Sequence, residues 1–75
     1  MEIRHKVGQN VEELRKALGL SQEQLGFDTG LHRTYISGIE RGIRNPTATV
    51  LERLAAGLKV TPGMLLDRQP GQKLK

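Results

Sequence analysis

Apolar residues in this chain recur every three or four positions, the spacing that places them on one face of an α-helix. The first such segment stops near Gly19, and its apolar positions are Ile3, Val7, Val11, Leu14 and Leu18. A second clear segment lies after residue 47, with apolar positions Val50, Leu51, Leu54 and Leu58. No stretch alternates apolar and polar residues as a half-buried strand would. The pattern predicts an all-α protein.

Residues typical of helix ends place two more helices between these segments. Ser21 followed by Gln24 is a capping-box pattern, which predicts a second helix over about 22–29. Gly30 suits the left-handed conformation that ends many helices. A third helix, over about 32–41, follows after almost no linker.

The second half of the chain predicts a fourth and a fifth helix. Thr47 is suited to cap the fourth, and Thr61 followed by proline begins a fifth that runs through Leu66. The fourth helix lacks a glycine at its end, so we expect Lys59 to adopt the turn. Gly57 lies inside that helix, so Gly57→Ala is expected to stabilise the protein by about 0.5–1 kcal/mol.

Length and composition limit what this helical chain does. Seventy-five residues make one domain, predicted over residues 1–67, and the Pro, Gly and charged residues of 68–75 predict a flexible tail. The absence of Cys excludes disulfides, thiolate metal sites and a thiol nucleophile. No apolar run is long enough to span a bilayer, and the N-terminus lacks a secretion signal, so we expect a cytoplasmic protein.

The net charge of +4 is concentrated around the third predicted helix. Between Arg33 and Thr47, three arginines accompany one acidic residue, Glu40. Such a distribution favours an anionic partner, although an ordinary solvated surface explains the charge by itself equally well.

The third predicted helix has an unusual polar side. At about 3.6 residues per turn, Ile36 and Ile39 fall together on its apolar side. The opposite side carries Arg33, Thr34, Ser37, Gly38 and Arg41. A glycine inside a helix costs about 1 kcal/mol relative to alanine, so we interpret this side as one that a partner approaches closely. The DNA major groove fits, because arginine binds guanine with two hydrogen bonds and short side chains let a helix sit deep.

The two helices joined near Gly30 form a helix-turn-helix pattern. The stretch LSQEQLGFDTGLHRTYISGIERGIRNPTATVLERLAAGLKV resembles the Cro/repressor-type (Xre-like) family of transcriptional regulators, and LHRTYISGIERGIRN is similar to the controller proteins of restriction–modification systems. The resemblance spans about residues 7–67. It implies a compact five-helix bundle of the lambda-repressor-like type that reads double-stranded DNA with its third helix as a homodimer on a near-palindromic operator, the docking geometry of phage repressors in this broad family.

The resemblance also implies roles for individual residues. The base-reading residues would be Arg33, Thr34 and Ser37. The DNA phosphates would be contacted by Gln22, His32, Tyr35, Arg41, Arg44 and Asn45. For Tyr35 packing at the core margin is an equal alternative, and His32 also fits a tolerated helix cap. The family pattern further implies a partly buried ion pair between Arg15 and Glu40, and Gly26 stands where the family usually has alanine.

Two other functional classes are alternatives to DNA binding. The chain lacks an HExxH or clustered Cys/His pattern, so we expect no enzyme, cofactor, metal site or small-molecule ligand. An antitoxin-like or bridging adaptor with the same fold is the main alternative, since fold does not fix function. The dimer surface is expected at Met64, Leu65 and Leu66, whose apolar side chains exceed what one small core needs.

Overall fold

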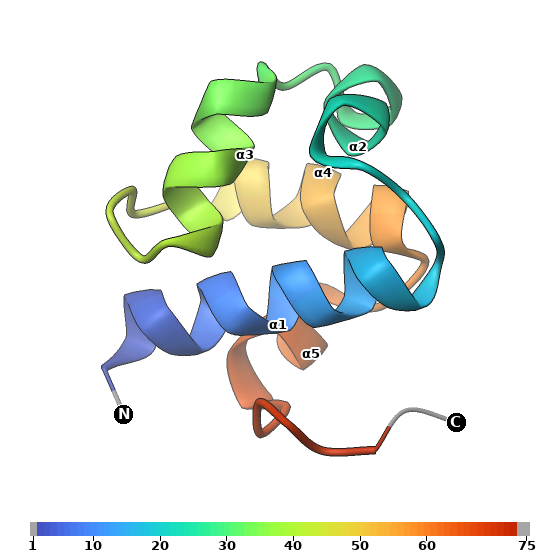
Figure 1. Cartoon of the computed structure of the whole chain (residues 1–75). Helices are drawn as coiled ribbons and strands as arrows, with labels where there is room; N and C mark the ends of the chain where they lie inside the picture. The colour runs from blue at the N-terminus through green and yellow to red at the C-terminus, as the bar shows by residue number, and fades with distance from the viewer. Residues whose placement is uncertain (1, 74–75) are drawn as a thin grey trace.

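Five α-helices follow one another along the chain in the computed structural model, which describes residues 2–73 (Figure 1). They are α1 (Ile3–Ala17), α2 (Gln22–Thr29), α3 (Arg33–Glu40), α4 (Ala48–Leu58) and α5 (Pro62–Asp67). The described residues contain no strand. The prediction of an all-α, five-helix protein is confirmed, with every helix close to its expected position.

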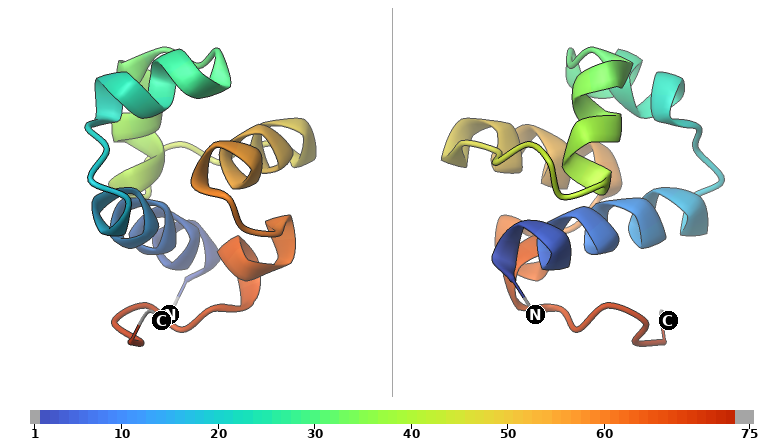
Figure 2. Two further views of the ribbon diagram at one scale, coloured as in Figure 1. Left: turned by 90° about the vertical axis from the view of Figure 1, so that its right-hand side faces the viewer. Right: turned by 60° about the vertical axis from the view of Figure 1, so that its left-hand side comes forward.

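All five helices contribute to one hydrophobic core. Fully buried apolar side chains come from each of them: Val11, Leu25, Ile36, Ile39, Leu54 and Leu65. α1 packs against α3, α4 and α5, while α2 packs against α3 and α4. Figures 1 and 2 show α2 and α3 together at one end of the molecule and α5 at the other. α3 therefore has one side on the core and another side open to solvent.

Side-chain caps explain where the helices begin. The Ser21 hydroxyl accepts a hydrogen bond from the backbone N–H of Gln24 at 2.9 Å, as the sequence predicts. The second hydrogen bond of a capping box, from the backbone N–H of Ser21 to the side chain of Gln24, is not formed. The Gln24 amide instead donates to Asp28 at 3.1 Å. Gly30 ends α2 with φ 75°, and Lys59 ends α4 with φ 62°, both in the left-handed region. The expected turn at Lys59 is thus present.

The segment after α5 is held against α1. Arg68 is buried, and its guanidinium donates to Asn10 Oδ1 at 2.8 Å and to Glu13 Oε1 at 2.7 Å. The backbone N–H of Gly71 also donates to Glu13, at 2.8 Å. The sequence predicts a flexible tail from residue 68, and in this structure α1 carries hydrogen-bond partners for Arg68 and Gly71. The last two residues of the predicted tail, 74–75, lie outside the described residues.

None of the helices within residues 2–73 combines the length and the apolar character needed to cross a membrane.

Candidate nucleic-acid interface

α2 and α3 are joined by a tight three-residue turn. The backbone N–H of Leu31 donates to the carbonyl of Gly26 at 3.0 Å, and Gly30 supplies the positive φ. A Cβ atom at position 26 would lie 2.5 Å from the carbonyl oxygen of Leu31. The chain therefore needs glycine at this position, because the turn passes directly over α2.

The outer face of α3, formed by Arg33, Thr34 and Ser37, is open. Arg33 and Thr34 are exposed and Ser37 is partly buried, while Ile36 and Ile39 on the inner side are fully buried. The helical spacing of the sequence thus separates a core side from a polar side. Arg33 and Thr34 are therefore fully available to a partner, and Ser37 is partly available.

His32 caps the first turn of α3. Its Nδ1 accepts a hydrogen bond from the backbone N–H of Thr34 at 3.1 Å and lies 2.8 Å from the Thr34 hydroxyl. Because Nδ1 accepts, the neutral ring carries its proton on Nε2. The arrangement fixes the imidazole at the start of α3 and leaves Nε2–H as a donor.

A buried ion pair ties α1 to α3. Arg15 Nε donates to Glu40 Oε2 at 2.7 Å, and Arg15 Nη2 donates to Oε1 at 3.0 Å. The two side chains are only 9% and 3% exposed. The hydrogen bond to the Glu40 carboxylate raises the pKa of Arg15 against the opposing effect of burial. The pair expected from the family resemblance is present.

Gln22, at the start of α2, belongs to the same cluster. Its amide Nε2 donates to Glu40 Oε1 at 3.0 Å, and the side chain is partly buried. One of the two amide hydrogens is therefore used inside the protein. The position of Gln22 at the N-terminus of α2 is fixed by this bond.

Gly38 does not belong to the exposed side of α3, so its interpretation from the sequence is wrong. It is buried, and a Cβ atom there would lie 2.6 Å from Cγ of Arg44. The loop after α3 turns back at this point, since the backbone N–H groups of Ile43 and Arg44 donate to the Gly38 carbonyl at 2.9 and 3.1 Å. The missing side chain makes room for Arg44, a role that the helical pattern alone does not reveal.

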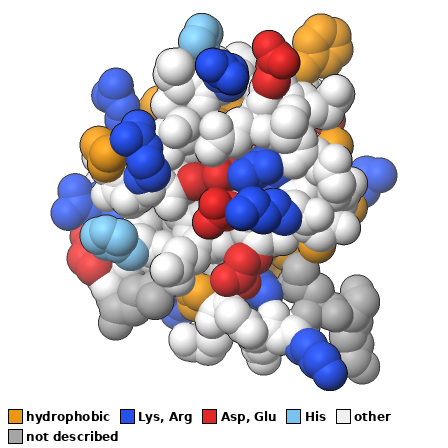
Figure 3. Space-filling view, in the orientation of Figure 1, with side chains coloured by type: hydrophobic (Ala, Val, Ile, Leu, Met, Phe, Trp, Pro, Cys, Tyr) orange, Lys and Arg blue, Asp and Glu red, His pale blue; other side chains and the backbone are white. Residues whose placement is uncertain are grey.

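The surface around the end of α3 is positively charged. Arg33, Arg41 and Arg44 are exposed, whereas Glu40 is buried and neutralised by Arg15. The space-filling view shows basic side chains on the left, where Figure 1 places the end of α3 and the following loop (Figure 3). Between residues 33 and 47 the surface thus presents arginines without an acid, which favours an anionic partner.

The remaining predicted site residues fall in different environments. Asn45 is exposed in the loop next to Arg44. Tyr35 is partly buried and packs against the core, as the alternative interpretation expected. Of the expected dimer surface, Leu65 is fully buried in the core, so this assignment is wrong: its side chain is used inside the monomer. Met64 and Leu66 are 38% and 37% exposed.

A tight turn between two short helices, the second of which presents an open polar face, defines the helix-turn-helix class of domain. Residues 11–65 match the family model described as "Helix-turn-helix". The chain belongs to this helix-turn-helix family.

Its relatives agree with the Xre-like resemblance. The chain is 47% identical over 66 residues to the control protein C.BamHI of Bacillus amyloliquefaciens, a match that covers 87% of this chain and 82% of that protein. The structure of the restriction-modification controller protein C.AhdI from Aeromonas hydrophila superposes with a TM-score of 0.80 and 47% identity, covering 83% of this chain and 94% of that one. The structure of SinR, the master regulator for biofilm formation, in complex with DNA has a TM-score of 0.78 and 37% identity, covering 81% and 98%.

Proposed function

We propose that this protein is a sequence-specific regulator of transcription that inserts α3 into the major groove of double-stranded DNA. The observation that carries the proposal is the open outer face of α3, where Arg33, Thr34 and Ser37 lie opposite the buried isoleucines. An adaptor has no need to keep this face clear, whereas a helix that reads base edges does. The relatives support the same function: one is SinR, solved bound to DNA. Such a protein acts in the cytoplasm, where its DNA is found.

Each polar group near α3 has a chemical role in this proposal. Arg33 donates two hydrogen bonds to a guanine, and the hydroxyls of Thr34 and Ser37 contact neighbouring base edges. Phosphate contacts, which fix the helix in the groove, come from Gln22, His32, Tyr35, Arg41, Arg44 and Asn45. The Nε2–H of His32 and the second amide hydrogen of Gln22 are the donors that remain after the internal hydrogen bonds.

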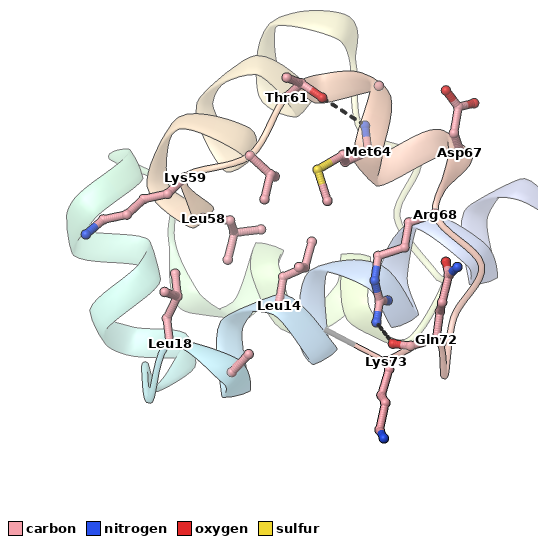
Figure 4. Close-up of a pocket in the computed structure, with 13 residues that line it drawn as sticks. Leu14, Leu18, Leu58, Lys59, Thr61, Met64, Asp67, Arg68, Gln72 and Lys73 are labelled. Carbon is pink, nitrogen blue, oxygen red and sulfur yellow. Dashed lines mark hydrogen bonds between the residues drawn. The ribbon is translucent and has the colours of Figure 1, made fainter. Parts of the chain in front are cut away.

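The protein acts as a homodimer, each copy placing α3 in one half of a near-palindromic operator. Met64 lines an apolar groove of about 880 Å³ between α1, α4 and α5, together with Leu14, Leu18 and Leu58 (Figure 4). The partner that we propose for this groove is a second copy of the chain. Because α5 packs on α1 and α4, at the opposite end from α3, self-association there leaves both reading helices free.

Selection of bound duplexes from a randomised pool tests the proposal. The expected result is an enriched motif with two-fold symmetry and half-sites about one helical turn apart. Enrichment of a single unpaired half-site would contradict the homodimer but not the reading of bases by α3. If no motif is enriched, the result contradicts sequence-specific DNA binding and favours the antitoxin-like or adaptor alternative.

Two arginine variants separate base reading from phosphate binding on the selected duplex. Arg33→Ala should weaken binding by about 1–3 kcal/mol and relax the preference at one base pair. Arg44→Ala should weaken binding to all duplexes alike and reduce the slope of log K against log salt by about one unit. Titrations at several salt concentrations, on the selected and a scrambled duplex, measure both effects. Identical behaviour of the two variants contradicts the assigned roles.

A further inference from the structure

The side chain of Arg44 lies on the surface of α3 at the one position of that helix without a side chain. A Cβ atom at Gly38 would lie 2.6 Å from Cγ of Arg44 and 3.6 Å from both Cβ and Nε. Apart from the chain neighbours of Gly38 and the backbone of α3 itself, these three atoms are the nearest to that site, and all belong to Arg44. The stem of Arg44 therefore occupies the space that any other residue at position 38 would fill.

The backbone of the loop holds Arg44 in this place. The N–H groups of Ile43 and Arg44 both donate to the Gly38 carbonyl, at 2.9 and 3.1 Å, so the loop cannot slide along α3 without losing two hydrogen bonds. Cγ is the first atom of the side chain beyond Cβ, so its position depends on the single torsion χ1, which has three staggered conformations. A methyl group at position 38 has to be accommodated by a change in the Arg44 side chain.

The position of Gly38 decides where the guanidinium of Arg44 emerges. On a helix the surface neighbours of position 38 lie three and four residues away, which includes Thr34 and Arg41. Thr34 belongs to the outer face of α3, and Arg41 is exposed, with its Nε directed to the carbonyl of Ser37 at 3.4 Å. Because its stem crosses α3 at Gly38, Arg44 lies next to Arg41, beside the outer face.

From this geometry we infer that Gly38 is a positioning residue for DNA binding: it seats Arg44 across α3 so that the guanidinium reaches a phosphate next to the reading face. The inference rests on the proposed function. Gly38 does not itself approach the DNA, since Arg44 covers it. Its effect on binding therefore passes entirely through Arg44.

A double-mutant cycle tests this inference. The proteins are the wild type, Gly38→Ala, Arg44→Ala and the double variant, each titrated with a mixed-sequence duplex of about 30 base pairs, which accommodates two half-sites one turn apart. Arg44→Ala should weaken binding roughly tenfold, the size of one charged hydrogen bond, and lower the salt slope by about one unit. Gly38→Ala should reproduce most of this loss of affinity and lower the salt slope by a similar amount. In the Arg44→Ala background, Gly38→Ala should change neither the affinity nor the salt slope.

The fold provides an independent readout. Gly38 lies inside α3 without a positive φ, and alanine favours a helix over glycine. The side chain of Arg44 is exposed and is able to rotate away from the added methyl group, so Gly38→Ala should melt close to the wild type. If the single variant does not fold, comparison of the double variant with Arg44→Ala still decides, because the stem that the methyl group meets is then absent.

The outcomes distinguish the inference from the proposed function. If Gly38→Ala weakens DNA binding equally in the wild-type and the Arg44→Ala backgrounds, the inference is overturned and position 38 itself contacts DNA. Unchanged binding by Gly38→Ala overturns it as well, since Arg44 then reaches the phosphate from another conformation. If Arg44→Ala binds as tightly as the wild type, Arg44 has no phosphate to be positioned for, and the inference also fails. Failure of the wild type to bind any duplex overturns the proposed function instead.

Discussion

In the sequence Glu40 lies between Arg33 and Arg41, but its carboxylate faces the interior of the protein. Arg15 binds both of its oxygens, and Gln22 donates to one of them, so α1, α2 and α3 meet at this single acid. Arg15 also donates to the carbonyl of Leu20 at 2.8 Å, which fixes the turn between α1 and α2. The pair holds α3 in place and keeps the one acidic side chain of residues 33–47 away from the surface.

Replacing Arg15 tests how much this pair contributes to stability. Arg15→Met should lower the free energy of unfolding by about 3–5 kcal/mol, because it leaves the buried Glu40 charge without its cation. For a domain of this size the melting temperature should fall by at least roughly 12 °C. Circular dichroism during heating measures the change.

Lys16→Met is the matched control on the same helix. Lys16 pairs with Glu12 at 3.3 Å, but the two side chains are 65% and 42% exposed, so the loss should stay below about 1 kcal/mol. Equal destabilisation by the two variants would mean that the buried pair has no special role.

At the scale of elements, α2 and α4 touch through Gly57. A Cβ atom at this position would lie 2.7 Å from Cγ2 of Thr29 and 3.2 Å from Cδ1 of Leu25. The Thr29 hydroxyl donates to the carbonyl of Leu25 at 2.7 Å, which prevents the methyl group from turning away. The expectation that alanine stabilises α4 here neglected this contact between helices.

Gly57→Ala is therefore now expected to destabilise the protein. The gain in helix propensity of about 1 kcal/mol is outweighed by overpacking of about 1–3 kcal/mol, for a net loss of about 1 kcal/mol in the free energy of unfolding. Thr29→Ser removes Cγ2 and keeps the hydroxyl, so Gly57→Ala should cost less in that background. Urea unfolding of the four proteins measures both costs, and equal costs would exclude Thr29 as the cause.

At the scale of the whole molecule, the segment after α5 closes onto α1 through polar contacts. Asn10 is completely buried, and its amide donates to the carbonyls of Leu65 and Arg68 at 3.0 and 2.8 Å, which satisfies the end of α5. Glu13 accepts from Gly71 and Arg68. The Gly71 N–H first, and then Arg68, hold the pKa of Glu13 below its ordinary value near 4.5, against the opposing effect of burial.

The lowered pKa gives the stability a defined dependence on pH. A carboxylate whose pKa is lower in the folded state stabilises the fold above its ordinary pKa, and this contribution is lost as pH falls through the folded pKa. Glu13→Gln should therefore reduce the free energy of unfolding at pH 7 by about 1 kcal/mol or less, because water screens a carboxylate that is a third exposed. The difference from the wild type should shrink as the pH falls below 4.5.

Thermal unfolding at neutral and acidic pH measures this effect. Glu12→Gln, which removes the neighbouring carboxylate that pairs with exposed Lys16, controls for the loss of one negative charge on α1. A Glu13→Gln deficit that persists unchanged in acid would contradict an electrostatic origin.

The sequence by itself determined the features that depend on neighbours within a few positions. The spacing of Ile36 and Ile39 defines the outer face of α3, Ser21 begins α2, and Lys59 ends α4 in the expected turn. Helix periodicity and capping are local, since they concern backbone groups and side chains three or four residues apart. The family resemblance, carried by the same stretch, added the Arg15–Glu40 pair.

Only the tertiary structure decided which surfaces the elements share. Gly38 was predicted to face a partner but lies under Arg44, Leu65 was predicted to face a second copy but fills the core, and Arg68, in the segment predicted to form a flexible tail, binds α1. Each outcome depends on a close approach between side chains that a helical pattern does not place relative to one another. Such contacts are fixed by how five helices pack at once, because a shift of about one methyl group in a dense core changes which neighbours fit.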